Sequence, residues 1–277
     1  MTQLAHRTES HIPAMGRGLY TAKTDATGGE GAPVMTKFGR LATISFRCFG
    51  ALVLPPNSWA QQRPQIVEKV AKTYGLDSWN EIEAVRYTFH LEFDTLNVSR
   101  SWEWEPKTTK VYYEGKDKDS KPVKVTYMRS ELSSQPDAVK KEIDPAFIND
   151  NYPLLFPLRA YWDTSATVIE QGTYNLPVGN GSAEVVAVKY PAEARGYTPG
   201  DTWQLYVGKD HRVEYIVYVS GGAKASLFYG TNADHKKAGP LLIATDHKGT
   251  ADGKPIRIWY SDVSVKLTGS DKWTDAQ

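Results

Sequence analysis

Apolar and polar residues alternate along much of the chain after residue 80, and this period of two predicts a β-rich fold. The segment AVRYTFHLEF (84–93) places one row of side chains on one face of a strand: Val85, Tyr87, Phe89, Leu91 and Phe93. In VSRSWEWE (98–105), Val98, Arg100, Trp102 and Trp104 share a face, while Ser99, Ser101, Glu103 and Glu105 share the other. The second row predicts the wet side of a half-buried sheet.

Further strands follow the same pattern. TTKVYYEG (108–115) reads as the return arm of a hairpin, and KPVKVTYMRS (121–130) alternates through Val123, Val125 and Tyr127. Later strands are predicted at 183–190, 202–207, 213–219, 226–229, 241–246 and 256–267, separated by Gly- and Asp-rich turns. About ten strands in order, without βαβ alternation, predict one antiparallel meander.

Two regions predict helices. Residues 64–75 carry one apolar stripe (Ile66, Val67, Val70, Ala71 and Tyr74), begin at Pro64 and end at Gly75. Downstream, Pro136 suits a helix start, and Asp144 and Pro145 suit the cap and first position of a second short helix. Pro153 and Pro157 bracket an apolar segment, and we expect no helix to run through them.

The first sixty residues differ from the rest. Residues 1–34 are rich in Thr, Gly and Ala, and we interpret them as disordered or as a mis-assigned upstream start. Residues 35–60 have a basic opening, an apolar run and small residues near Ala60, which predicts a signal peptide cleaved after Ala60. Because Arg47 interrupts the run, a peripheral amphipathic segment is the alternative. Residues 61–277 are then one exported, periplasmic or secreted domain.

Composition narrows the function classes. With 33 Lys+Arg against 32 Asp+Glu, the net charge of +1 offers no electrostatic basis for a nucleic-acid partner. The apolar run near residue 50 is shorter than the roughly 20 residues that span a bilayer, so we expect no transmembrane segment in the mature protein. Cys48 lacks the preceding pattern of a lipid-modified cysteine, and the mature chain has no cysteine and hence no disulfide.

Motifs for catalysis and metal binding are missing. His90, His211, His235 and His247 show no helical ligand spacing, so no metal is predicted, and there is no nucleophile elbow or phosphate-binding loop. Glu103 and Glu105, about 7 Å apart on one strand face, are the only candidate acid pair for a hydrolase. We predict a non-enzymatic protein without a cofactor.

The tryptophan face is the candidate binding site. The predicted ligand-binding residues are Phe89, Leu91, Arg100, Trp102, Trp104, Phe147, Leu154, Leu155, Phe156 and Trp162. The two adjacent indoles and the apolar segment between the prolines present more apolar surface than one helix can bury, which favours a bound ligand. Ordinary packing of a sheet against a helix also explains this row of large apolar side chains. For Arg100, a salt bridge or a snorkelling side chain is favoured over contact with an anionic headgroup.

The order of these elements, with RSWEWEPKTTKVYYEG and GYTPGDTWQLYVGKDHRVEYIVY, resembles secreted bacterial proteins of the LolA/LolB-like lipoprotein-localisation superfamily, in an uncharacterised subgroup. The resemblance implies an α+β, mainly β fold: a curved antiparallel sheet, or unclosed β-barrel, with helices plugging its concave face. It also implies a hydrophobic small molecule, lipid or acyl chain as ligand, with an envelope lipoprotein as a further candidate partner.

Three other classes stay open. A carbohydrate-binding module would place its indoles on an open, solvent-facing surface, whereas an envelope interaction protein would have a completely filled core. A hydrolase would bring two or more carboxylates together in a cleft.

Overall fold

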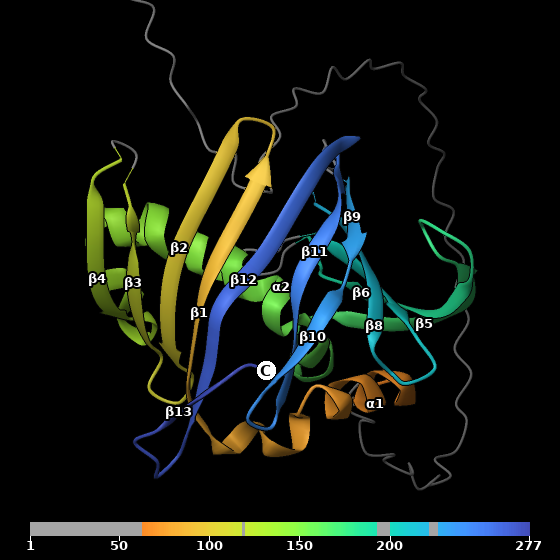
Figure 1. Cartoon of the computed structure of the whole chain (residues 1–277), viewed down its shortest axis with the longest axis horizontal. Coiled ribbons are helices and arrows are strands. Elements are labelled where there is room, and N and C mark those ends of the chain that lie inside the picture. Colours follow the sequence, from red (N-terminus) through yellow and green to blue (C-terminus); the bar gives the residue numbers. More distant parts are fainter. Residues whose placement is uncertain (1–62, 118–119, 193–199, 222–226) are drawn as a thin grey trace, which may run out of the picture. The chain divides into compact units, whose positions relative to one another are not determined.

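The computed structural model describes residues 63–117, 120–192, 200–221 and 227–277 (Figure 1). The predictions for residues 1–34 and for the signal peptide at 35–60 therefore lie outside the described residues. None of the described helices is long and apolar enough to cross a membrane.

The described residues form thirteen strands in one antiparallel sheet; the alternation of side chains predicts the antiparallel sheet but only about ten of its strands. The first group is β1 (Ile82–Phe93), β2 (Leu96–Glu105), β3 (Lys110–Lys116) and β4 (Pro122–Met128). The second group is β5 (Thr167–Asn175), β6 (Ser182–Lys189), β7 (Thr202–Val207), β8 (Val213–Val219) and β9 (Leu227–Thr231). The last group is β10 (Ala233–Ala238), β11 (Leu241–Ala251), β12 (Lys254–Leu267) and β13 (Trp273–Asp275).

The strand order is two meanders joined through the C-terminal strands, which differs from the single meander expected. The path runs β4-β3-β2-β1-β12-β11-β9-β8-β7-β6-β5, with β10 paired to β11 and β13 to β12. Strand β12 pairs with β1 over the whole length of β1, so the last long strand closes the gap between the two meanders. Strands β4 and β5 end the path, and the sheet does not close into a barrel.

The described helices lie before β1 and between β4 and β5. They are α1 (Gln65–Thr73), the 3-10 helices η1 (Leu76–Glu81) and η2 (Arg129–Ser134), the π-helical turn η3 (Val139–Ile143) and α2 (Asp144–Trp162). Helix α1 buries its predicted stripe and is followed by Gly75 at φ +100°. A Cβ there would lie 2.7 Å from the Pro240 carbonyl oxygen, so only glycine fits this close approach.

The expectation that no helix runs through Pro153 and Pro157 is wrong. Helix α2 is continuous across both prolines, although each removes one backbone hydrogen bond and costs about 3 kcal/mol in an exposed helix. Tertiary burial outweighs this cost, because apolar residues on nearly all sides of α2 are buried. The predicted short helix at Asp144 is thus the start of a 19-residue helix.

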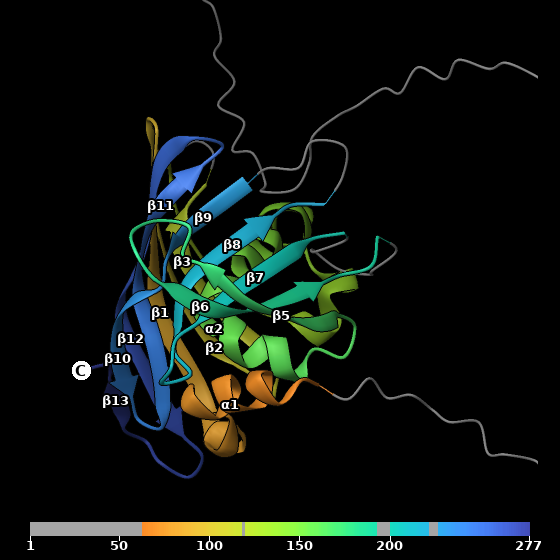
Figure 2. The ribbon, with the colours of Figure 1, turned by 90° about the vertical axis from the view of Figure 1, so that its right-hand side faces the viewer.

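The sheet curves around α2, with the β1–β2 region on one side of the helix and the β5–β8 region on the other (Figure 2). Ring contacts support this arrangement on both sides. Phe147 lies 5.4 Å from Trp102 of β2, and Phe156 stacks 4.3 Å from Trp203 of β7 (ring centroids). The core of the described residues therefore sits between α2 and the concave face.

Candidate functional site

The residues predicted to line a ligand site lie on the inner face of β1 and β2 and on α2, or at its end. Six are at most 3% exposed: Phe89, Trp102, Phe147, Leu154, Leu155 and Phe156. Four are partly exposed: Leu91, Arg100, Trp104 and Trp162. All of the apolar ones pack into or against one hydrophobic cluster, so their role as ligand contacts stays a prediction.

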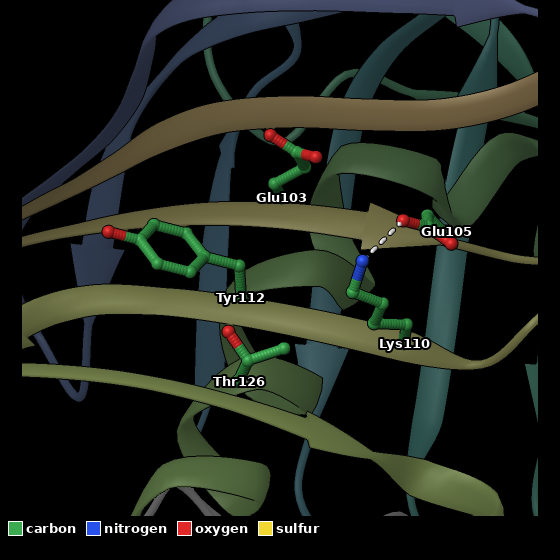
Figure 3. Close-up of a pocket in the computed structure, with 5 residues that line it drawn as sticks. All are labelled: Glu103, Glu105, Lys110, Tyr112 and Thr126. Carbon is green, nitrogen blue, oxygen red and sulfur yellow. Dashed lines mark hydrogen bonds and ion pairs between the residues drawn. The ribbon is translucent and has the colours of Figure 1, made fainter.

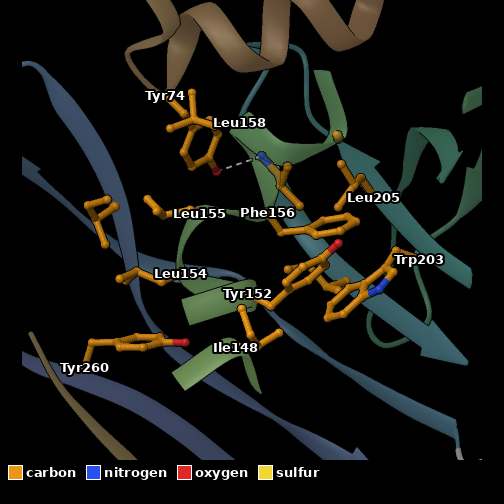
Figure 4. Close-up of a cluster of buried hydrophobic side chains, with 14 of the residues drawn as sticks. Tyr74, Ile148, Tyr152, Leu154, Leu155, Phe156, Leu158, Trp203, Leu205 and Tyr260 are labelled. Carbon is orange, nitrogen blue, oxygen red and sulfur yellow. Dashed lines mark hydrogen bonds between the residues drawn. The ribbon is translucent and has the colours of Figure 1, made fainter. Parts of the chain in front are cut away.

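Side chains of the chain itself occupy the space between α2 and the sheet. On the β7 side, the aromatic rings of Tyr152 and Phe156 pack on Trp203, and Trp203 contacts Tyr218 at 4.5 Å between ring centroids (Figure 4). Leu154 points the other way, toward Tyr260 (Figure 4). A ligand that binds here must therefore displace part of this packing.

Arg100 forms a buried ion pair with α2. Its Nε and Nη2 each donate to one oxygen of Asp150 at 2.7 Å, and Trp102 Nε1 donates to Asp150 Oδ2 at 2.9 Å. Asp150 is fully buried, and the Arg100 side chain is 14% exposed. Burial raises the pKa of Asp150, while Arg100 and Trp102 oppose that shift. Arg100 therefore makes the salt bridge favoured from the sequence.

A second ion pair anchors the start of α2. Arg129 Nε donates to Asp144 Oδ1 at 2.7 Å, and the Tyr127 hydroxyl donates to the same oxygen at 2.9 Å. Asp144 is 0% exposed. At the other end of the helix, Arg63 donates to the backbone carbonyls of Tyr161, Asp163 and Ala166. Polar contacts thus hold α2 at its start, its centre and its end.

Three tryptophans meet at the rim near the end of α2. Trp79 of η1 lies 4.8 Å from Trp162 and 6.1 Å from Trp104, between ring centroids. All three are partly exposed. Trp102, in contrast, is 2% exposed, which contradicts a sugar-stacking surface at that position.

The candidate acid pair lies on the outer face of the sheet. Glu103 and Glu105 line a shallow hollow of about 240 Å³ with Lys110, Tyr112 and Thr126 (Figure 3). Glu105 pairs with Lys110 at 3.1 Å, and the Thr108 hydroxyl, followed by Lys110, lowers the pKa of Glu105. The two acids do not converge in a deep cleft, as a glycosidase mechanism would require.

The described residues contain no group of three or more His, Cys, Asp or Glu side chains that could hold a metal ion.

Several side chains of the interior were not predicted as site residues. Asn151, Arg159, Tyr190 and Trp203 all join the interior near α2. A signal for the continuous helix was present in the sequence. Phe147, Ile148, Leu154, Leu155 and Leu158 are spaced with a helical period, and Asn151 occupies the position between them on the same helix face.

The fold and the site define an α+β, mainly β class of protein, in which an unclosed antiparallel sheet surrounds a buried, proline-containing helix. No known protein family matches the sequence, and no curated protein is similar to it.

Nine solved chains match the structure. A DUF1329 family protein from Desulfovibrio piger has a TM-score of 0.41 at 10% identity, over 74% of this chain and 94% of that one. The Mycobacterium tuberculosis lipoprotein LppX has a TM-score of 0.28 at 11% identity, over 76% and 98%. LprF from Mycobacterium bovis has a TM-score of 0.28 at 9% identity, over 76% and 96%.

Proposed function

We propose that residues 61–277 are one domain that binds an elongated hydrophobic molecule between α2 and the concave face of the sheet, without catalysing a reaction. The observation that carries the proposal is the enclosure of an apolar helix by a sheet with two free edges, β4 and β5. Because the sheet is not closed, α2 can move away from its bed without breaking a strand pair. The resemblance to LolA/LolB-like proteins, stated from the sequence, favours the same function.

The prolines make α2 the movable element. Pro153 and Pro157 remove two helix hydrogen bonds, and the π-helical turn η3 directly precedes the helix. Local openings occur where backbone hydrogen bonding is weakest. Movement of α2 must break the ion pairs that hold Asp144 and Asp150 in its first half, whereas the backbone contacts of Arg63 lie at its end.

The apolar surface buried between α2 and the sheet determines how large a ligand must be. Phe147, Leu154, Leu155, Phe156 and Leu158 are each at most 3% exposed. Exposing five such side chains costs about 10 kcal/mol at about 2 kcal/mol each. Only a ligand with a similar apolar surface can offset this cost, so a long acyl chain or lipid fits and a small polar molecule does not.

A photoreactive fatty acid that carries a diazirine tests the proposal on the full chain. After irradiation, mass spectrometry should find adducts on α2 and on inner-face residues such as Phe89 and Trp203. Excess unlabelled fatty acid should suppress them. Adducts confined to the outer face, or absent altogether, would overturn the proposal.

Two neighbouring valines of β6 supply a matched pair of variants. Val186 is 0% exposed and belongs to the inner hydrophobic cluster, whereas Val185 is 1% exposed and points to the other face. Valine to phenylalanine overpacks either site and costs about 1–3 kcal/mol. Only Val186→Phe occupies space between the sheet and α2, so it alone should lower the adduct yield severalfold. An equal effect of Val185→Phe would contradict inner-face binding.

We also propose that the chain is exported by a signal peptide at residues 35–60. The basic opening, the apolar run and the small residues near Ala60 support this. Export would place the binding domain in the periplasm or outside the cell, where lipids and envelope lipoproteins are candidate ligands.

A further inference from the structure

Four hydrogen-bond donors in the interior beside α2 have no acceptor among the described residues, and three of them belong to neighbouring residues. These three are Nδ2 of Asn151, Nε of Arg159 and the hydroxyl of Tyr87, and each atom is buried; the fourth is Nε1 of Trp203, on the β7 side. Asn151 is 0% exposed and Tyr87 is 1% exposed, whereas the Arg159 residue as a whole is partly exposed. Buried donors are nearly always paired in folded proteins, so three without acceptors require an explanation.

The three residues are neighbours. Arg159 Nη2 donates to Asn151 Oδ1 at 2.5 Å, which leaves the amide nitrogen of Asn151 free to donate elsewhere. Burial and the Asp150 charge raise the pKa of Tyr87, while the Arg159 charge and the Asn151 side chain, which lies close to the Tyr87 hydroxyl but outside good hydrogen-bond geometry, act against that rise. Tyr87 also pairs in register with Trp102, a predicted ligand contact.

Arg159, which lies on α2 itself, differs from Arg100 and Arg129, which reach α2 from other elements. Arg100 is paired with Asp150 and Arg129 with Asp144, but Arg159 forms no ion pair within the described part of the chain. Its guanidinium lies 4.7 Å over the Tyr152 ring, and burial lowers its pKa.

The carboxylate of Asp163 raises the pKa of Arg159 but is engaged with other donors. The Asp163 carboxylate accepts hydrogen bonds from Tyr190 at 3.0 Å and from Ser165 at 2.6 Å. Its charge acts on Arg159 from outside ion-pair distance. A partly buried arginine with a free Nε is therefore left without a carboxylate, which is costly unless a partner arrives.

We propose that Arg159, Asn151 and Tyr87 bind the oxyanion end of the hydrophobic ligand, a carboxylate or a phosphate. This inference rests on the proposed function and adds the chemistry of the ligand's polar end. An oxyanion accepts several hydrogen bonds at once, and guanidinium binds both groups with charge-assisted hydrogen bonds. A bound water would satisfy donors but would leave the Arg159 charge without a counter-ion.

Binding of three probes with the same sixteen-carbon chain tests the inference: palmitic acid, hexadecyl phosphate and hexadecanol, each added to the full chain. We expect the two anions to bind about tenfold or more tightly than the alcohol, as charged hydrogen bonds predict. Arg159→Met should remove this preference by lowering the affinity for both anions to about that for the alcohol. The control Arg257→Met, on the outer face beside Trp259, should keep the preference.

A second variant covers the case in which Arg159→Met fails to fold. Asn151→Asp places a carboxylate next to Arg159, so it should raise the thermal midpoint of the free protein and weaken binding of both anions. A lower midpoint with an intact anion preference would overturn the inference.

The outcomes separate the two proposals. If acid, phosphate and alcohol bind equally well to the inner face, the oxyanion site is wrong and the hydrophobic binding site stands. If none of the three binds, the proposed function itself fails. A preference for phosphate over carboxylate, or the reverse, supports the site and identifies which oxyanion it accepts.

Discussion

The ion pair between Arg100 and Asp150 joins the inner face of β2 to the centre of α2, and its loss should be strongly destabilising. Asp150→Asn keeps the shape of the side chain but removes the charge that two 2.7 Å hydrogen bonds compensate. Breaking a buried pair costs about 3–5 kcal/mol, because the remaining charge stays buried without a partner. This is a large part of a typical stability of about 5–15 kcal/mol.

A double-mutant cycle with Arg100→Met isolates the pair. Replacing both partners removes the uncompensated charge, so the double variant should lose about 1–3 kcal/mol less than the sum of the single losses. Arg100→Met alone should cost less at pH 5 than at pH 8. Without Arg100, burial favours the protonated form of Asp150, and a carboxyl with a raised folded-state pKa is more stabilising at low pH.

Urea unfolding of the full chain, followed by tryptophan fluorescence, measures each free energy of unfolding. The exposed pair of Lys254 and Asp94, at 2.9 Å, is the control, and Asp94→Asn should cost less than about 1 kcal/mol. If the losses at Arg100 and Asp150 add within about 0.5 kcal/mol, the two groups are not coupled and the reasoning is refuted.

Two further predictions concern pH and export. Burial lowers the pKa of His247 from 6.5 to about 4, so its neutral form contributes stability above pH 6.5 that is lost as the pH falls toward 4, in all about 3 kcal/mol. The stability of His247→Gln should fall less between pH 7 and pH 4.5 in urea titrations, and parallel curves for both proteins would contradict this. When the full chain is expressed in a bacterium, N-terminal sequencing of exported protein should begin at Gln61; an uncleaved, cytoplasmic product would refute export.

The sheet was predictable because its signal is local. In β1 and β2 every second side chain points inward, and the register places Tyr87 opposite Trp102, so alternation alone identified the inner face. Strands β5 and β10 were missed for a physical reason. Most residues of β5 are exposed, and β10 is largely polar, so neither strand shows the apolar alternation of a half-buried strand.

The helix and its polar partners could not be obtained in the same way. Two prolines argued against a continuous α2, and only its enclosure by the sheet reverses that local preference. The partner of Arg100, Asp150, lies 50 residues away, in a segment for which the sequence predicted no continuous helix and therefore no alignment of its residues with the strands. Knowing the face of Arg100 therefore did not reveal its acceptor.

The unpaired polar groups beside α2 help to distinguish a binding site from a purely structural core. Aliphatic side chains of similar volume would fill the space beside α2 without unpaired donors, and each unpaired buried group costs about 1–3 kcal/mol. Asn151, Arg159 and Tyr87 therefore make the free protein less stable than a purely apolar core would. Local violations of packing rules of this kind are expected where a binding site is built into a fold. An anionic ligand would accept hydrogen bonds from these donors and so restore the lost stability when it binds. The proposed anion preference of Arg159 and the proposed acyl-chain site between α2 and the sheet would then serve one ligand.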